Sequence, residues 1–512
     1  MLSTRLLWGA LVALAVVDLV VLTQLLTRSP PSSSAAAAAA PWTRWRDAAS
    51  VITGSDSSNN DPSSTTWRRS DFECLRWVAT DDDGHPTGET RECWQRIRGG
   101  DSGYCEIRNA SSGERRHVLH TTSLSLKPDV RFTCRLARAF SDVGAQAKSY
   151  RHDPPMPFES APSAPNGIVM AVYERVLPSA YASIRRLRAV GCRLPIELWF
   201  RFEELSVEHA VVQHLVEAYG PIYCRVIHDE RAQGFYVKAH AVFYSRFDAV
   251  LLLDADTFAV RDPTPLFASA PFRAVGAVFW PDFWHPGNTI FNVHAQSVVW
   301  EMLGLAPVDT LEQESGQALI DRRRSRAALE RLLFFATHQP NLFAKLQLVW
   351  GDKDLFRLAW LHARAPFHFV DARLPGALGV VHAQRERFCG MSMAQYDLDG
   401  RTLLFVHRNT VKLTGDGVRE KRIWHALQEY APGAWPPPTV LSFNGEKLFN
   451  ETSCFGVKRF AGPQRDGAVA MRYASTSSTV RRLRLLEEEL IHYASEASVL
   501  LAMATATENA PV

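Results

Sequence analysis

The sequence predicts an α/β protein in which a mostly parallel sheet follows a small cysteine-rich module. From Pro165 onward, short runs of apolar and β-branched residues alternate with segments of helical periodicity. Runs that are apolar throughout indicate strands buried on both faces, which is typical of a parallel sheet covered by helices. Ahead of this region, four of the eight cysteines lie close together in the sequence.

The composition is that of a globular protein. Of the 512 residues, 46% are hydrophobic and 22% are charged, which excludes a collagen-like, coiled-coil or wholly disordered chain. The length is sufficient for about two to four domains. Lys and Arg number 57 against 54 Asp and Glu, a net charge of +3. This near balance does not indicate the broad basic surface that a nucleic-acid partner requires.

The N-terminus predicts a membrane anchor. The run from Leu6 to Leu26 is predominantly apolar and is long enough to cross about 30 Å of hydrocarbon as a helix. Asp18 opposes insertion by about 2.5–3.5 kcal/mol, but the Leu and Val residues of the run together outweigh it. The alternative is a cleaved signal peptide. Signal peptides have a shorter apolar centre followed by a small-residue cleavage site, and this run is longer and lacks such a site at its end. We expect a cytosolic tail at 1–5, a signal anchor at 6–26 and a flexible stem at 27–66.

Residues 67–150 are expected to form a small lumenal module stapled by disulfides. Disulfides form in oxidising compartments and stabilise modules that have little core. A zinc site is the alternative, but the cysteines lack the two-residue spacing of zinc knuckles. Glycosylation patterns at Asn109 and Asn450 agree with a lumenal location. The module contains Cys74, Cys93, Cys105 and Cys134, whose pairing stays open, and Cys192 with Cys224 and Cys389 with Cys454 are further potential pairs.

The sheet is expected in residues 165–430. Residues 431–512 are expected to form an extension with an amphipathic helix over about 478–502. Three aromatic residues, Trp280, Phe283 and Trp284, either stack on a sugar or pack in the core. The expected strands are 168–173, 196–200, 222–227 and 249–253, and the expected helices are 179–190, 207–219 and 237–247.

Two acids stand where the last of these strands ends. Asp254 and Asp256 follow the apolar run 249–253 in the context VLLLDADTFAVRDP. Parallel sheets bind ligands beyond the carboxyl ends of their strands. Two carboxylates one residue apart at that point are able to reach a divalent ion and a diphosphate bound to it. The alternative is a pair of ordinary turn acids.

Several motifs between Pro165 and Lys412 resemble the fungal-type Golgi alpha-mannosyltransferases. They are VMAVYE followed by SIRRLRAVGCRLPIELWF, then GFYVKAHAVFYSRFDAVLLLDADTFAVRDPTPLF, FWPDFW, EQESGQALIDRRR, WGDKDLFRLAW and FVHRNTVK. The resemblance implies a GT-A-like nucleotide-diphosphosugar transferase fold. It also implies retaining transfer of mannose from GDP-mannose to a mannosylated glycan or glycoprotein, by a type II membrane protein whose catalytic part lies in the Golgi lumen.

The same resemblance implies a metal site. Asp256 would bind the metal directly, and Asp254 would contact the ribose or bridge to the metal. His407, at the end of the apolar run 403–406, matches a position that supplies an imidazole ligand in related folds. Mn²⁺ suits this mixture of carboxylate, imidazole and phosphate donors. For His407 the alternative is a histidine that is merely hydrogen-bonded.

Four further residues are expected to bind the donor. Lys238 precedes the acid pair on a predicted helix and would offset diphosphate charge, with a solvated lysine as the alternative. Tyr173 follows the first strand, where the base and ribose usually lie, and would stack on the nucleotide. Gln317 lies in a segment of small residues that lets a sugar approach the backbone. Lys412 ends the matching region and is also assigned to the substrate.

Three acids are candidates for the reacting centre. Glu314 begins the segment Glu-Ser-Gly-Gln, which is expected to precede a long Arg-rich helix. The alternative to a role in substrate binding is that Ser315 is a plain helix cap. Asp352 and Asp354 would bind the transferred mannose or the acceptor hydroxyl. Retention requires a covalent carboxylate intermediate or attack on the face that the diphosphate leaves. We expect the second route, with Asp352 or Glu314 as the residue to test for a covalent adduct.

Two other functions fit these residues. One is a UDP-sugar-dependent retaining enzyme of the same fold, because fold does not set the substrate and nothing in the sequence distinguishes guanine from uracil. The other is a non-catalytic sugar-binding or scaffold protein in which the cysteine module performs the recognition. The intact acid pair and the His-Arg-Asn segment argue against the second, since a protein without chemistry does not need them.

Overall fold

The computed structural model describes most of the chain after residue 70. The described residues are 51–52, 71–81, 83–152, 165–285, 289, 292–370, 373–431, 441–444, 449, 453–459 and 469–508. The expected tail and anchor, most of the expected stem, and Asn450 lie outside them. Among the residues described, no helix combines the length and apolar character needed to cross a membrane.

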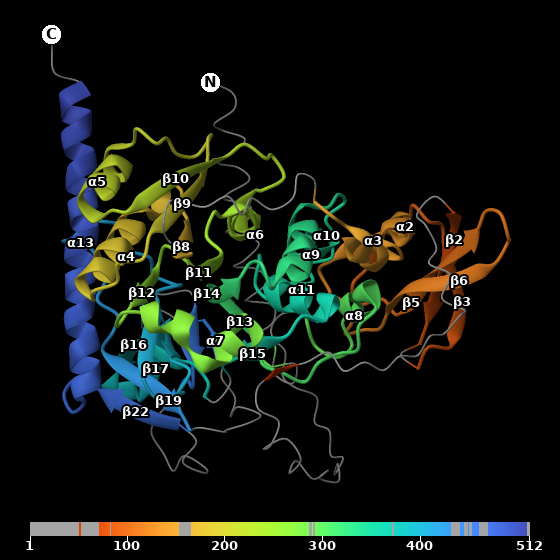
Figure 1. Cartoon of the computed structure of the whole chain (residues 1–512). Helices are drawn as coiled ribbons and strands as arrows, with labels where there is room; N and C mark the ends of the chain where they lie inside the picture. Colours follow the sequence, from red (N-terminus) through yellow and green to blue (C-terminus); the bar gives the residue numbers. More distant parts are fainter. Residues whose placement is uncertain are drawn as a thin grey trace.

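An eight-stranded sheet lies at the centre of the region that begins at Pro165 (Figure 1). In spatial order its strands are β1 (Val51–Ile52), β15 (Phe367–Phe369), β13 (Ala277–Pro281), β14 (Gln313–Asp321), β11 (Ala249–Leu253), β8 (Asn166–Ala171), β9 (Ile196–Arg201) and β10 (Ile222–Ile227). The pairs β11–β8, β8–β9 and β9–β10 are parallel. The four predicted strands are therefore present and form the parallel half of the sheet.

The predicted parallel arrangement holds only in part for the other half, where β13 and β15 are parallel neighbours. β14 is antiparallel to both β11 and β13, and β1 is antiparallel to β15, so the sheet is mixed. The segment 314–317 lies within β14 and does not introduce a helix; the next helix, α9, begins only at Arg326. The polar start of β14, Gln-Glu-Ser-Gly-Gln, conceals the apolar pattern by which a buried strand is recognised.

Helices cover both faces of this sheet, which explains why β11 is apolar throughout. Leu251 and Leu253 pack with the helices on one face, whereas Val250 and Leu252 pack with those on the other. Alternate side chains of a strand point to opposite faces, so a strand covered on both sides needs apolar residues at every position. The helices concerned are α4 (Leu177–Ala189) and α5 (Ala210–Tyr219) on the first face, and α6 (Val237–Tyr244), α9 (Arg326–Thr337) and α11 (Leu355–Ala363) on the second.

A second, antiparallel sheet begins directly after the acid pair. Its main path is β12 (Thr257–Ala259), β18 (Leu403–His407), β17 (Arg387–Tyr396), β16 (Gly376–His382), β19 (Ala426–Tyr430) and β22 (Val469–Tyr473), and β21 (Cys454–Gly456) pairs with β17. The disulfide Cys389–Cys454 confirms one pair that the sequence allowed. Strands from beyond residue 430 thus complete a sheet that starts at the acid pair.

The C-terminal helix α13, Ser478–Glu508, confirms the expected amphipathic helix. It packs against α4 and α5 and runs along one edge of the molecule (Figure 1). Its apolar stripe joins the core of the second sheet. The buried residues of this stripe are Val480, Leu483, Leu486, Leu490, Ile491 and Ala494.

The aromatic cluster around Pro281 belongs to the core. Trp280, Phe283 and Trp284 are 0%, 1% and 3% exposed. The Nε1 atom of Trp280 donates a hydrogen bond to the Tyr396 carbonyl at 2.9 Å. The packing interpretation of these residues is therefore correct, and they offer no surface on which a sugar could stack.

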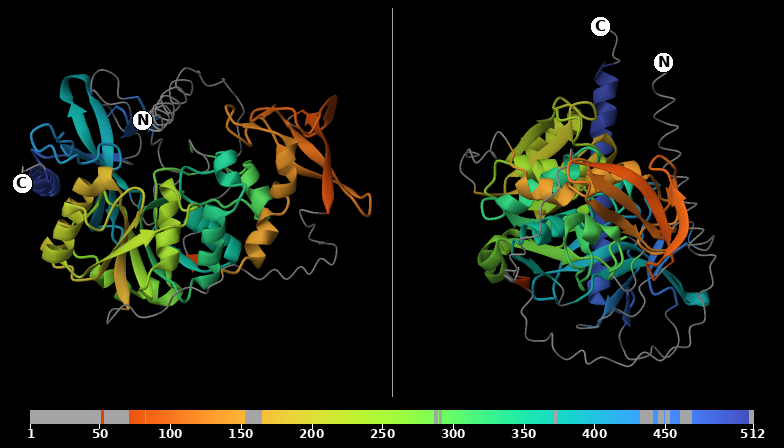
Figure 2. Two further views of the ribbon diagram at one scale, coloured as in Figure 1. Left: turned by 90° about the horizontal axis from the view of Figure 1, so that it is seen from above. Right: turned by 90° about the vertical axis from the view of Figure 1, so that its right-hand side faces the viewer.

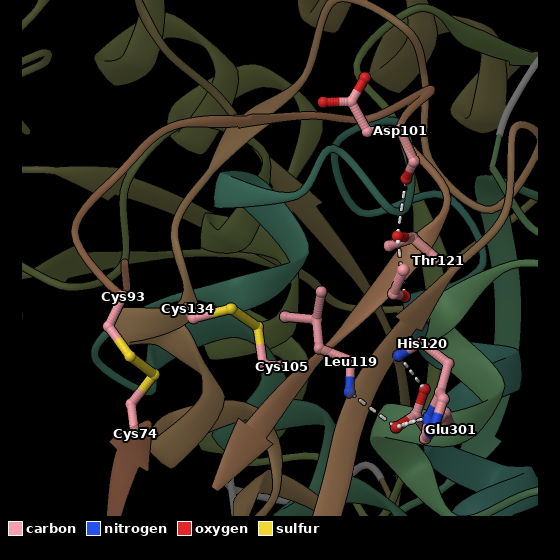
Figure 3. The surroundings of a disulfide bond; sticks show 10 residues. Cys74, Cys93, Asp101, Cys105, Leu119, His120, Thr121, Cys134 and Glu301 are labelled. Carbon is pink, nitrogen blue, oxygen red and sulfur yellow. Dashed lines mark hydrogen bonds and ion pairs between the residues drawn. A yellow bond between two sulfur atoms is a disulfide. The ribbon is translucent and has the colours of Figure 1, made fainter. Parts of the chain in front are cut away.

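The cysteine-rich module lies at one end of the molecule (Figure 2). It is a four-stranded antiparallel sheet in the order β3 (Pro86–Arg91), β2 (Phe72–Thr80), β5 (Gly103–Asn109) and β6 (Arg115–Thr121). The disulfides Cys74–Cys93 and Cys105–Cys134 (Figure 3) confirm the expected staples. The suggested pair of Cys192 with Cys224 does not form: both thiols are free, with Cys192 buried in the core beside α4 and Cys224 on the outermost strand β10.

One carboxylate joins the module to the rest of the protein. Glu301, on α8 (Val298–Leu303), accepts hydrogen bonds from the backbone N–H groups of Leu119 and His120, each at 2.8 Å (Figure 3). The Nδ1 atom of His120 lies 3.1 Å from the same carboxylate. This hydrogen bond raises the pKa of His120 above its ordinary value, against the opposing effect of burial.

We expect this junction to weaken as the pH rises. Because the folded-state pKa of His120 is raised, its contribution is complete below the ordinary histidine pKa of about 6.5 and is lost as the pH rises through the folded value. The His120 side chain is 55% exposed, so the effect is about 1 kcal/mol or less. Thermal unfolding between about pH 6 and pH 9 measures it. Glu301→Gln should flatten this dependence, whereas Glu92→Gln on the module surface should not; equal slopes for all three proteins would contradict the assignment.

Candidate metal and substrate site

The acid pair occupies the position that the sequence predicts. Asp254 is the first residue after β11, and its backbone N–H donates to the Gly316 carbonyl of β14 at 2.9 Å. Asp256 is 2% exposed, whereas the Asp254 side chain is 20% exposed. The two carboxylates therefore sit where the central strand leaves the sheet, one of them enclosed and the other reachable from solvent.

His407 reaches the acid pair through the second sheet. β12 and β18 are antiparallel neighbours, and Thr257 pairs with His407. The backbone N–H of Arg408 donates to the Asp256 carbonyl at 3.0 Å, which fixes the two segments together. Asp254, Asp256 and His407 each offer a ligand atom, and these atoms all lie within 4.8 Å of one another. The structure thus brings together the three ligands inferred from the sequence.

The surroundings of these residues fit a divalent cation. Ligand atoms bound to one ion at about 2.0–2.6 Å lie no more than about 5 Å apart, and those of these three residues lie within 4.8 Å of one another. Asp254, Asp256, Glu314 and Asp352 contribute four negative charges, and Lys238 and Lys412 contribute two positive charges. With His407 neutral, as a metal ligand must be, two negative charges remain. One divalent cation would balance them, and the carboxylate and imidazole donors suit Mn²⁺.

Two lysines contact the acid pair. The Nζ atom of Lys238, on the first turn of α6, lies 2.9 Å from Asp254 and 3.0 Å from Asp352. Lys238 is buried, so the alternative of a solvated helix lysine does not apply. Lys412 forms an ion pair with Asp256, and its side chain is 45% exposed. Each carboxylate of the acid pair therefore has its own ammonium group.

Buried opposite charges set the ionisation of the site. Burial disfavours the charged form of His407, but Asp256 and Glu314 outweigh it and raise the His407 pKa to about 10. Burial likewise opposes ionisation of Asp256, yet His407 and Lys412 lower the Asp256 pKa below its ordinary range. Burial raises the pKa of Asp352 to about 6 despite its contact with Lys238. A cation at the acid pair would replace the proton that these carboxylates hold on His407.

Glu314 lies on the other side of the histidine ring. Its Oε1 atom is 3.3 Å from His407 Nδ1 and accepts a hydrogen bond from the Gly316 backbone N–H at 2.6 Å. A carboxylate in this position orients a metal-binding imidazole. Gly316 has no room for a side chain, because a Cβ atom there would lie 2.6 Å from His407 Nδ1. The segment Glu-Ser-Gly-Gln, which the sequence predicts to lie against a sugar, thus contacts His407 directly.

The two acids of the Trp-Gly-Asp-Lys-Asp motif have different surroundings. Asp352 contacts Lys238 and is therefore next to the acid pair. Asp354 is 1% exposed, lies 2.7 Å from Arg357 and 3.1 Å from Lys353, and accepts a hydrogen bond from the Gln313 backbone N–H at 3.0 Å. These contacts hold the turn at the start of α11. The structure brings Asp352 to the site and leaves the catalytic role of Asp354 a prediction.

Gln317 lies next to the acid pair but is enclosed. It pairs with Leu253 across the β11–β14 ladder and is 0% exposed. Neither of its amide atoms has a hydrogen-bond partner among the residues described. Its predicted contact with the substrate would require an opening that the structure does not display, so that contact stays a prediction.

A cavity of about 730 Å³ lies near the acid pair and is linked to it through Lys412. Lys412, on its wall, contacts Asp256, and Tyr173, which is 42% exposed, lines it as well. Two of the predicted nucleotide-binding residues, Tyr173 and Lys412, therefore line one cavity. Ala497, Ser498 and Leu501 of α13 form another part of the wall. No local pattern in the sequence marks them, because α13 reaches the cavity by packing on α4 and α5, which lie far from it in the sequence.

Comparison with known proteins shows that much of the region from Pro165 to Asp397 is similar to mannosyltransferases. A family model described as "Mannosyltransferase putative" matches residues 165–299 and 305–397. The alpha-1,2-mannosyltransferase MNN21 of Candida albicans is 25% identical over 309 residues, 50% of this chain and 47% of that protein. MNN2 of Saccharomyces cerevisiae, also an alpha-1,2-mannosyltransferase, is 27% identical over 199 residues, 32% of this chain and 33% of that protein. The resemblance inferred from the motifs is thereby confirmed.

This similarity supports the prediction that the chain is a glycosyltransferase. The chain spans about half the length of the curated relatives that it matches first. Among solved structures, the mannosyltransferase Ktr4p from S. cerevisiae is similar over 46% of this chain and 77% of its own, with 11% identity and a TM-score of 0.27. A likeness at that TM-score supports no conclusion about this chain.

We expect Gly316→Ala to weaken Mn²⁺ binding. The added methyl group would displace the His407 ring, and a change of this kind beside a metal ligand typically lowers affinity about 10- to 100-fold. Gly100→Ala is the matched control, because a Cβ atom there meets no atom within 4 Å. Titration of free Mn²⁺, followed by electron paramagnetic resonance with GDP present, measures the affinity. Equal affinities for the two variants would show that the metal does not bind beside His407.

Proposed function

We propose that this chain is a retaining alpha-mannosyltransferase with a GT-A-like fold that transfers mannose from GDP-mannose to a mannosylated glycan or glycoprotein. One observation carries the proposal: Asp254, Asp256 and His407 place their ligand atoms within 4.8 Å of one another. The acid pair of this cluster lies in the segment that is similar to mannosyltransferases. A divalent cation held there would neutralise the diphosphate of a sugar donor.

The nucleotide is assigned to the cavity beside the acid pair. Its volume of about 730 Å³ is in the range of small-molecule sites, about 300–1,000 Å³. The exposed ring of Tyr173 offers a face for stacking on a base or ribose. Lys412 connects the cavity wall to Asp256. If the base of the nucleotide lies in the cavity, the diphosphate attached to it would therefore lie near Lys412 and the acid pair.

Lys238 and Lys412 supply the positive charge that the leaving group needs. As the anomeric bond breaks, negative charge accumulates on the diphosphate while the sugar becomes cationic. Both ammonium groups are held by carboxylates of the site. Because they are oriented before the substrate arrives, their reorganisation costs little in the transition state.

The contacts of the two candidate nucleophiles favour front-face attack. The Glu314 carboxylate faces His407 and accepts the Gly316 backbone N–H. Asp352 faces Lys238 and is 3% exposed. Since each carboxylate already holds a partner, we assign them to positioning His407 and Lys238, and the acceptor hydroxyl attacks on the face from which the diphosphate departs. A trapped covalent adduct on either residue would overturn this assignment.

A Golgi lumenal location completes the proposal. Three disulfides, Cys74–Cys93, Cys105–Cys134 and Cys389–Cys454, support folding in an oxidising compartment. A signal anchor at residues 6–26 would hold the enzyme in the membrane as a type II protein.

A donor panel tests the function. We expect the purified lumenal part to release mannose from GDP-mannose in the presence of Mn²⁺, and chelation to stop the reaction. UDP-glucose, UDP-galactose and UDP-N-acetylglucosamine are the alternatives in the panel. Turnover of a UDP-sugar alone would replace the donor assignment, and no turnover with any donor would favour a non-catalytic sugar-binding protein.

We expect Asp256→Asn to lower kcat by about 100-fold or more, because it removes a charged ligand from the metal site. The substitution keeps the shape of the buried side chain. Asp83→Asn, at an exposed turn of the module, is the control. Full activity of Asp256→Asn with Mn²⁺ as the only metal would show that the metal assignment is wrong.

A further inference from the structure

Two exposed aromatic side chains, Phe235 and Trp350, belong to segments that contact each other near the acid pair. Phe235 is 60% exposed and Trp350 is 48% exposed. The Phe235 ring packs on Gly351, the residue after Trp350: a Cβ atom on Gly351 would lie 2.7 Å from Phe235 Cγ. Exposed aromatic groups that adjoin one another are typical of binding surfaces.

The two segments that carry these rings also contribute Lys238 and Asp352, which contact each other in the candidate site. Phe235 belongs to the turn Gly234–Tyr236, which leads into Lys238. Trp350 lies two residues before Asp352. Lys238 contacts both Asp352 at 3.0 Å and Asp254 at 2.9 Å. The aromatic pair is therefore joined to the acid pair through a single lysine.

The turn that presents Trp350 is fixed. Gly351 has φ of 62°, in the left-handed region that favours glycine. The Lys353 backbone N–H donates to the Trp350 carbonyl at 3.0 Å and closes the turn. A side chain on Gly351 would collide with Phe235, so the glycine allows the turn and the ring to pack together.

The cysteine-rich part of the chain reaches the same place. The Nζ atom of Lys127, which lies in the loop between β6 and the short strand β7 (Arg131–Phe132), is 5.7 Å from the centre of the Trp350 ring. This loop is held by a hydrogen bond from the Val130 backbone N–H to the Lys127 carbonyl at 3.0 Å. The N-terminal module thus contacts Trp350 through an ammonium group that lies over its ring.

We propose that Phe235 and Trp350 form a subsite that binds a hexose ring of the acceptor glycan. The apolar C–H face of a hexose packs on aromatic rings, and such surfaces are rigid and cost little conformational entropy. The donor nucleotide is assigned to the cavity of Tyr173 and Lys412, which contacts Asp256, whereas the aromatic pair is joined to Asp254. The Trp280 cluster is buried and offers no other stacking face. This inference rests on the proposed function, which requires an acceptor sugar near the anomeric carbon.

Acceptor kinetics test the subsite. For Trp350→Ala and for Phe235→Ala we expect the KM for an alpha-linked mannotriose acceptor to rise roughly 3- to 10-fold, the range expected for loss of one ring contact. The KM for GDP-mannose should rise by much less. Trp350→Phe, which keeps a ring, should restore most of the acceptor affinity. Trp94→Ala is the matched control, because Trp94 is 61% exposed and lies in the disulfide-stapled module.

A binding measurement separates failure of the subsite from failure of the proposed function. Saturation-transfer NMR with mannotriose and the unreacted protein requires no turnover. Loss of the saturation-transfer signal in Trp350→Ala, with retention in Trp94→Ala, supports the subsite even if GDP-mannose is not the donor. Absence of mannotriose binding by the wild type, or acceptor KM values unchanged in both alanine variants of an active enzyme, would overturn it.

Discussion

The site depends on the compensation of buried negative charge. Asp256, Glu314 and Asp352 are all buried, and isolated ionised carboxylates at such depth are strongly unfavourable. Lys238, which precedes the acid pair in the sequence, contacts Asp254, and Lys412, which follows it, contacts Asp256. His407 lies between Asp256 and Glu314. These partners hold each carboxylate in a defined orientation. A divalent cation and a diphosphate would enter a set of charges that is already ordered, which is the condition for efficient electrostatic stabilisation.

The second sheet and α13 explain how His407 keeps its place. Arg408, the next residue, forms a fully buried ion pair with Glu487 of α13. Glu487 also accepts the backbone N–H groups of Ile423 and Trp424, at 2.8 and 3.0 Å. A buried ion pair is strongly destabilising to break, since one charge is left without a partner. The C-terminal helix therefore fixes the segment that contains His407, and it also forms part of the cavity wall.

The parallel half of the sheet and much of the site were accessible from the sequence. Continuous apolar runs identified β8 to β11, and their order located Asp254 and Asp256 where the last of them ends. The motifs led to Lys238 and His407. The antiparallel strand β14 was missed, because its polar first half gives no strand pattern and its buried character comes from neighbours distant in the sequence.

The sequence by itself determined the stapled module, the strand that ends in the acid pair and the residues able to bind a cation, because apolar runs, cysteine spacing and local motifs are properties of short segments. Only the tertiary structure decided that Glu314 faces His407 rather than leading into a helix. It also decided that α13 lines the cavity of Tyr173 and Lys412 and that Phe235 packs on Gly351, the neighbour of Trp350. These relations join segments far apart in the chain, and only the packing of sheets and helices determines which of them meet.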